Sequence, residues 1–453
     1  MKVYLSSVMT SRTPLIVLFF ISMVLVAQAQ ALTFDSRSNG SDGVLDFSGV
    51  PAGTVIFDPK DASTFDPANP DRKLDVDNDN VFHFTSVKIP NNVEVVLRAD
   101  KLLWRPVYWL AQSDIVIEAN GQLILTGADG HAATSQGDAR IPSIPGPGGF
   151  PGGIGASLVN SAKAGFGPGA GLPSAADGDG GGASHTTVGI GNFGGTAGPV
   201  YGSPYLLPLV GGSGGAGGGN STATQAASRS GGGAGGGAIV LASSTQVIHD
   251  GYILAEGGYG TGTSTRTTAA YGGGSGSGGS VRIMAPTIIG NHSSRYITVR
   301  GGRGSGGAGH GRIRLEAFTN KYSGRFFPDN ADVVRISGLV PTTAFLPTDT
   351  GIPGWPSVRV DSINNVALPT IPTGSFVVPD SEINTLNSVP ITFVTENIPT
   401  TADLTLFVIS PDNETLVISP SYSTGTTTSA TWGASVTFPP GFSRGFVKAT
   451  WIN

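Results

Sequence analysis

Short apolar stretches recur through the middle of the chain, and three of them directly follow glycine-rich sequence. They are VYWLA (107–111), AIVLA (238–242), VRIMA (281–285) and IRLEA (313–317). Alternate positions line up as apolar columns, one of which comprises Trp109, Val240, Ile283 and Leu315. Columns with a period of two are typical of strands stacked in register with one face inward. The same pattern places Arg282 on the outward face, where substitution by aspartate should be tolerated.

A second pattern follows each of the first three stretches. IVIEANGQLILTG, QVIHDGYILAEGG and the looser TIIGNHSSRYITVRGG each hold two apolar runs separated by a short polar segment. Asn120-Gly121 and Asp250-Gly251 stand at equivalent places and suit a tight turn with positive φ. Each unit is therefore strand, turn, strand and glycine-rich excursion, starting with FHFTSVKIPNNVEVVL at residues 82–97. Because parallel strands need a crossover, the units predict a parallel β-helix.

Glycine is the outstanding feature of the composition, with 69 residues that are concentrated between Gly127 and Gly311. We expect these segments to leave and re-enter the coil, where positive φ and close backbone approach are needed. The stretch 133–230 has no clear period, but it carries Phe150, Phe166 and other large apolar residues. A solvated linker would not carry them, so we expect much of this insert to pack against the coil.

The amino-acid composition changes near residue 325, where the glycine-rich sequence ends. A Pro-rich segment, 326–356, is predicted to be a linker or wrapping segment, and residues 357–453 show short strands such as VPITFVTENI and ADLTLFVISP. Short alternating strands without a helical pattern favour an immunoglobulin-like β-sandwich. The predicted fold class is therefore all-β: a glycine-rich parallel β-helix over residues 32–325, followed by a small immunoglobulin-like β-sandwich over 357–453.

The N-terminal 31 residues have the pattern of a cleaved secretory signal peptide. Lys2 and Arg12 precede an apolar run, and the small residues that follow predict cleavage after Ala29 or Ala31. A single-pass anchor is the alternative. The mature chain is then expected to be secreted or at the cell surface, with no membrane span of its own. Cysteine is absent, so its stability must come from core burial and not from disulfides.

Charge narrows the range of partners. Charged residues make up only 13% of the chain, and the formal net charge is -5. Capture of nucleic acid by a basic surface is therefore not expected. Carbohydrate or other cell-surface components are the expected partners.

Two motif matches arise from glycine content alone. Ser213 satisfies GxSxG, and Gly231, Gly233 and Gly236 satisfy GxGxxG. Neither lies in a strand-to-helix turn, which their chemistry requires, so we interpret both as chance matches.

Gly309-His310-Gly311 followed by Arg312-Ile313-Arg314 resembles fused fragments of two elements of polygalacturonases. That resemblance implies hydrolysis of an acidic polysaccharide with the help of paired carboxylates. The family's adjacent aspartate pair does not occur in this chain. We therefore predict that Ile313 lies in a core column and His310 in the preceding loop, and we assign no catalytic residue.

An acidic loop, LDVDNDN, carries Asp75, Asp77 and Asp79 at alternate positions. Oxygen ligands at such spacing suit calcium, but an EF-hand would have glycine at position 80 and an acid at 86. The chain has Asn80 and Ser86. The interpretation is a solvated acidic loop, with a calcium site at Asp75–Asp79 as the alternative and no other metal or cofactor expected.

Over residues 32–320 the chain is similar to exported glycine-rich parallel β-helix proteins of bacteria, most of them uncharacterised. The quoted strands and the GGGAGGGAIVLASS type of re-entry carry this resemblance, which implies a surface structure and no particular chemistry. The expected function is a non-catalytic structural or adhesive surface protein with a C-terminal interaction module. The alternative is a polysaccharide hydrolase or lyase built on the β-helix.

Overall fold

The computed structural model describes most of the chain after the first 32 residues. The described ranges are 33–131, 141–156, 161–175, 178–191, 193–219, 230–260, 272–291, 295–304, 306–329, 331–337, 343–346, 356–369, 379–409, 415–441 and 443–451. The predicted signal peptide lies outside them. Within these ranges the fold is all-β apart from two short 3-10 turns, η1 (Phe47–Gly49) and η2 (Ala62–Thr64). In the described part of the chain, no helix has the length and apolar character to cross a membrane.

Six parallel strands close into a hydrogen-bonded ring. Around it lie β3 (Val81–Ile89), β5 (Val107–Ala111), β8 (Ala238–Ser243), β11 (Ser280–Gly290), β9 (Gln246–His249) and β6 (Ile115–Ile117). The long strands β3 and β11 close the ring, because β3 pairs with both β5 and β6 and β11 pairs with both β8 and β9. Outside the ring, β1 (Gly43–Asp46) pairs with β3, and β13 (Arg312–Tyr322) links β11 to β15 (Asp332–Ser337).

The predicted fold class, a parallel β-helix followed by an immunoglobulin-like β-sandwich, is therefore wrong, although the chain is all-β. The apolar columns correctly indicated parallel strands, and the register that they predicted holds for β5, β11 and β13 but not for β8. The columns carried no information on how the strands close into a ring. The strands of the second pattern pair with the same long strands as those of the first pattern, which the columns do not reveal. Residues 81–84 of β3 pair with β5, and residues 87–89 pair with β6.

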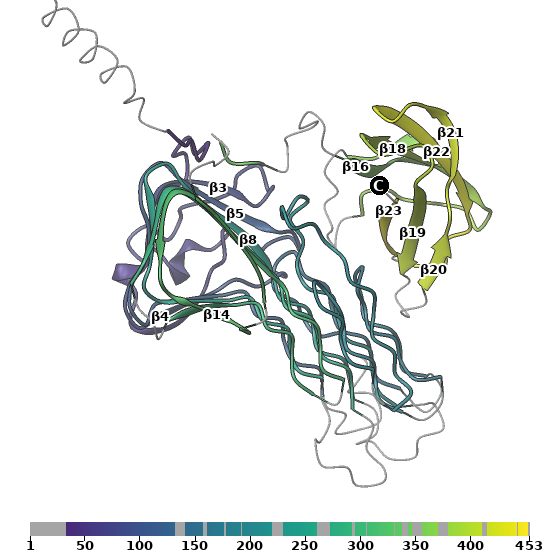
Figure 1. Cartoon of the computed structure of the whole chain (residues 1–453), viewed down its shortest axis with the longest axis horizontal. Helices are drawn as coiled ribbons and strands as arrows, with labels where there is room; N and C mark the ends of the chain where they lie inside the picture. The colour runs from purple at the N-terminus through teal and green to yellow at the C-terminus, as the bar shows by residue number, and fades with distance from the viewer. Residues whose placement is uncertain are drawn as a thin grey trace, which may run out of the picture. The chain divides into compact units, whose positions relative to one another are not determined.

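A second sheet is also parallel. Its order is β14 (Arg325–Phe327), β12 (Tyr296–Thr298), β10 (Tyr252–Leu254), β7 (Gln122–Ile124), β4 (Val93–Val96) and β2 (Gly53–Ile56). Figure 1 shows β4 and β14 on a different wall from β3, β5 and β8. Inward residues of both sheets share one core cluster, which includes Trp109, Leu123 and Ile283. Burial of this apolar surface is the main stabilising contribution.

The predicted column is displaced by one residue at β8. Trp109 pairs with Leu241, which pairs with Ile283 and then Leu315. Val240 faces the other way, in register with Tyr108 and Arg282.

The outward face of β8 and β11 is buried too. The sequence predicted that the insert packs against the strands, and yet it placed Arg282 in solvent. Val240 and Met284 belong to a second apolar cluster, and Leu206 and Leu209 of the glycine-rich insert pack there. Arg282 is only 2% exposed. The prediction that this arginine faces solvent is therefore wrong, because other segments of the chain, among them residues 343–346, cover this face.

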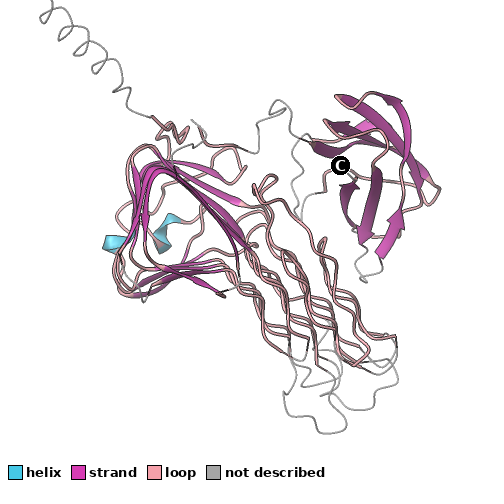
Figure 2. Cartoon of the chain, in the orientation of Figure 1, coloured by secondary structure: helices cyan, strands magenta, loops and turns pink. Residues whose placement is uncertain are grey.

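The glycine-rich segments form extended runs that continue from the ends of the strands and are drawn as loops in Figure 2. Residues 231–237 show the bonding pattern. Gly231, Ala234 and Gly237 donate to the carbonyls of His131, Ala128 and Leu125 at 2.9, 3.0 and 2.7 Å; Gly232 and Gly235 donate to Gly153 and Phe150 at 2.8 and 2.9 Å; Gly233 and Gly236 donate to Gly274 and Ser277 at 2.9 Å each. Every third residue thus faces the same neighbour. That is the periodicity of a polyproline II-type helix, which has no internal hydrogen bonds. We call these hydrogen-bonded runs the glycine bundle.

Close packing explains why glycine fills the bundle. A Cβ atom built on Gly235 would overlap the carbonyl of Gly212, and one on Gly233 would overlap that of Gly258. None of the glycines at 231–237 has a positive φ. Close backbone approach, one of the two expected reasons, therefore applies to this segment, and the need for positive φ does not.

The C-terminal strands form two antiparallel sheets. One contains β17 (Val366–Ala367), β16 (Ser357–Ile363), β18 (Val389–Glu396), β22 (Ser429–Val436) and β21 (Ser421–Gly425) in that order. The other contains β20 (Thr415–Ile418), β19 (Asp403–Ile409) and β23 (Arg444–Thr450). Residues of both sheets, among them Phe393, Leu406 and Trp432, share a separate core cluster.

Candidate functional site

The acidic loop directs its carboxylates at its own backbone. Asp75 Oδ1 accepts from the N–H of Asp79 at 2.9 Å, and Oδ2 accepts from that of Asn80 at 3.1 Å. Asp79 Oδ1 accepts from the N–H of Val81 at 2.8 Å. Within the described residues, no group of three or more His, Cys, Asp or Glu side chains is placed to hold a metal ion. The calcium site stays a prediction, and two of its three carboxylates already have other partners.

Burial changes the chemistry of this loop. Desolvation raises the pKa of Asp75 to about 7, although its two backbone hydrogen bonds act in the opposite direction. The neighbouring Asp79 also contributes to the higher pKa of Asp75. This buried carboxyl is 8% exposed and braces a turn, so its altered pKa has a structural cause.

His310 lies in the loop before β13, as predicted, and Ile313 is fully buried in the core. The Nδ1 atom of His310 accepts from the N–H of Gly301 at 3.2 Å. Burial lowers the pKa of His310, and so do two cations, Arg300 and Arg303. The charges acting on this imidazole are thus positive, whereas glycoside hydrolysis needs a pair of carboxylates.

The two arginines that follow His310 in the sequence are engaged elsewhere. Arg312 Nε pairs with Asp332 Oδ2 at 2.7 Å, and Arg314 Nε donates to Glu316 Oε1. The structure therefore does not assemble the polygalacturonase-like fragment into one site.

A buried charge cluster on the outward face of β11 and β13 comprises Arg282, Arg314 and Glu316. Glu316 is fully buried, and Arg282 Nη2 donates to both of its carboxylate oxygens at 3.1 and 3.2 Å. Arg314 Nη1 also donates to the carbonyl of Pro204 at 3.1 Å. Desolvation is the largest cause of the lowered pKa of Arg282, and Glu316 partly offsets it.

Aromatic rings cover this cluster. The Arg282 guanidinium lies 5.3 Å from the ring centroid of Phe345, and that of Arg314 lies 5.2 Å from the Tyr205 ring. The arrangement fastens two distant segments to the ring and leaves its charges enclosed. Its sequence signal was present: Arg314 and Glu316 stand two residues apart on one face of a strand, in register with Arg282 and Met284.

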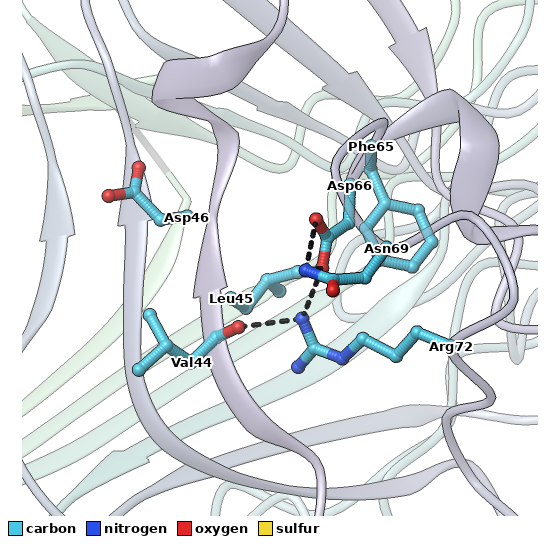
Figure 3. Close-up of a pocket in the computed structure, with 7 residues that line it drawn as sticks. All are labelled: Val44, Leu45, Asp46, Phe65, Asp66, Asn69 and Arg72. Carbon is cyan, nitrogen blue, oxygen red and sulfur yellow. Dashed lines mark hydrogen bonds and ion pairs between the residues drawn. The ribbon is translucent and has the colours of Figure 1, made fainter.

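A pocket of ≈ 360 Å³ lies beside β1. It is lined by Val44, Leu45, Asp46, Phe65, Asp66, Asn69 and Arg72 (Figure 3). Arg72 Nη1 donates to the carbonyl of Val44 at 2.8 Å and pairs with Asp66 Oδ2 at 3.1 Å. Asp46 lies apart from this pair in Figure 3 and accepts from the N–H of Ser48 at 2.8 Å. The polar groups of the pocket thus serve to brace its wall.

The two chance motif matches lie inside the glycine bundle. Ser213 is fully buried, and its Oγ accepts from the N–H of Gly169 at 3.0 Å. A buried hydroxyl bonded to backbone cannot act as an exposed nucleophile. Gly231, Gly233 and Gly236 donate to other runs of the bundle and form no phosphate-binding turn.

Comparisons with protein-family models, with curated proteins and with solved structures gave no match to this chain.

Proposed function

We propose that the chain is an exported, non-catalytic structural or adhesive protein of a cell surface. The ring and the glycine bundle would provide a rigid support, and the C-terminal sheets would provide an interaction module. The observation that carries this proposal is the three-residue bonding pattern of the glycine bundle, which joins runs that are distant in the sequence.

The bundle combines order with a lack of reactive groups. All seven residues of 231–237 donate a backbone hydrogen bond to another run, and all are buried. Paired backbone groups stabilise a rigid shape, and glycine and alanine add no catalytic side chain. The N-terminal pattern of Met1 to Ala31 supports export of such a structure.

The polysaccharide hydrolase or lyase has less support. The nearest candidate catalytic group, His310, has a pKa that is lowered by burial and then by Arg300 and Arg303, and no carboxylate is among the causes of this shift. In the pocket lined by Asp46 and Asp66, Arg72 is bonded to Asp66 and to the carbonyl of Val44. These polar groups are therefore already engaged with one another.

A polysaccharide panel separates the two functions. Mature protein would be collected from the medium of an expressing cell, where N-terminal sequencing should find Gln30 or Leu32 first. It would then be incubated with acidic and neutral polysaccharides while bound protein and released reducing ends are recorded. We expect binding without product. Product release that disappears in a folded His310→Ala variant would overturn the proposal in favour of the enzyme.

A further inference from the structure

The outward row of the second sheet forms a continuous ladder of side chains. One residue per strand contributes: Thr54, Glu94, Gln122, Tyr252, Tyr296 and Arg325. Their sequence neighbours Val55, Val95, Leu123, Ile253 and Ile297 point inward and are buried in the core. Because strands lie about 4.8 Å apart, the ladder spans the sheet at a regular spacing. Apart from the exposed Thr54 and Arg325, its members are half-buried, so each is accessible from outside.

One half of this ladder is aromatic. The ring centroids of Tyr252 and Tyr296 lie 4.9 Å apart, and those of Tyr296 and Phe327 also lie 4.9 Å apart. Each ring is fixed edge-to-face by the next, which is a favourable aromatic geometry. The rings are therefore held in place before any ligand arrives, which lowers the entropic cost of binding.

The other half of the ladder is polar. Glu94 accepts from Thr54 Oγ1 at 2.8 Å and from Gln122 Nε2 at 2.9 Å. These side chains hold one another in place along the row and add donors and acceptors beside the rings.

Arginines flank the aromatic half. Arg325 lies 4.7 Å from the Phe327 ring centroid and Arg295 lies 4.9 Å from that of Tyr252. Arg295 donates to two neutral groups, the Tyr252 hydroxyl and the Asn120 side chain. Arg325 pairs with Asp329 only at 3.9 Å, and both side chains are more than half exposed. An exposed ion pair of that kind contributes little, so the Arg325 guanidinium can exchange partners.

We infer that this ladder binds an acidic polysaccharide laid across the strands, which rests on the proposed non-catalytic surface function. The C–H groups of sugar rings pack against Tyr252, Tyr296 and Phe327, and uronate carboxylates pair with Arg295 and Arg325. This contact is confined to the aromatic half, because the Glu94 carboxylate in the polar half repels an acidic chain. A guanidinium fork matches the geometry of a carboxylate. A row of rings along an open sheet face suits a repeating chain better than a small molecule, which prefers an enclosed pocket.

Binding of mature protein to immobilised polygalacturonate, with dextran as the neutral polymer, tests this inference. Replacing both Tyr252 and Tyr296 by alanine should weaken binding about tenfold or more. Arg325→Gln should weaken binding and its dependence on salt. Tyr296→Phe, which keeps the ring, should retain binding. Tyr259→Ala is the matched control, because Tyr259 is 48% exposed and lies outside the ladder.

Circular dichroism and urea unfolding would verify that each variant folds. Should the double alanine variant misfold, Arg325→Gln decides alone, since its side chain is 53% exposed. Unchanged affinity in the folded variants, or equal binding to dextran, would overturn the ladder and leave the structural function standing. Release of reducing ends from polygalacturonate would instead overturn the proposed function.

Discussion

Ala234 shows what the glycine bundle accepts at a single position. Its methyl group is fully buried among glycines, and its N–H bonds to the carbonyl of Ala128. On either side, a Cβ on Gly233 or Gly235 would strike a backbone carbonyl. The requirement for glycine is therefore set position by position, by the neighbour that each residue faces.

Gly235→Ala should destabilise the protein. The added methyl group must push apart two runs of the bundle, because a backbone carbonyl cannot rotate away, and overpacking of this kind costs about 1–3 kcal/mol. Gly49→Ala is the control, since a Cβ there meets nothing within 4 Å. Urea unfolding of both variants measures the difference. Equal loss of stability would show that the contacts of Gly235 are not responsible.

At the scale of the elements, the covered outward face of β11 and β13 changes the expected effect of mutations. Arg282 was predicted to tolerate aspartate because it points away from the ring. It instead shares an enclosed site with Glu316, and the covering segment keeps water out. A side chain that points away from one core can thus still be buried when a second layer of the chain covers it.

Arg282→Asp should be strongly destabilising. It removes a partner of Glu316 and adds a second buried carboxylate beside it, and breaking a buried pair costs about 3–5 kcal/mol. Lys321→Asp, at an exposed position of β13, is the control. Chemical unfolding monitored by tryptophan fluorescence should separate the two variants clearly. Similar midpoints would mean that the charge cluster is not enclosed in solution.

The register of β8 could not be predicted from the sequence, for a physical reason. All six residues of β8 are buried, because one side faces the core and the other faces the covering segment. The contrast between apolar and polar positions, which reports register, is then absent. In β4, by contrast, buried and half-buried residues alternate, and the predicted run at residues 82–97 is found as β3 and β4.

The candidate site was predicted in part. The sequence placed Ile313 in the core and His310 in a loop, because an alternating strand follows a glycine-rich stretch. The aromatic ladder could not be foreseen, since Tyr252 and Tyr296 meet only through the pairing of β10 with β12. Such lateral contacts depend on register between strands that are far apart along the sequence, a property that local patterns do not contain.

At the scale of the whole molecule, buried histidines make folding sensitive to acid. Burial lowers the pKa of His185 to about 4 and that of His249 to about 3. The unfolded chain takes up a proton on each near pH 6.5, whereas the folded chain resists it. Stability should therefore fall as the pH decreases from about 6.5 to about 4. Asp75 acts oppositely, because its raised pKa favours the folded state as the pH decreases from about 7 to about 4.

His249→Gln should reduce the loss of stability at acidic pH, because glutamine has no proton to take up. The glutamine side chain can still bond to Tyr322. Urea midpoints at about pH 7 and about pH 5 would be compared for both proteins. We expect the variant to lose less stability between the two conditions than the wild type. Parallel losses would show that His249 is not buried in its neutral form.

The packing of the glycine bundle also has a genetic consequence. A change in the first or second base of a glycine codon always replaces the residue or ends the chain, and at Gly235 even alanine, the smallest substitute, collides with the carbonyl of Gly212. The stretch of lowest chemical complexity is therefore a large target for harmful point mutations. Repetitive sequence is often taken as a sign of relaxed selection, but here repetition and intolerance to substitution should coincide.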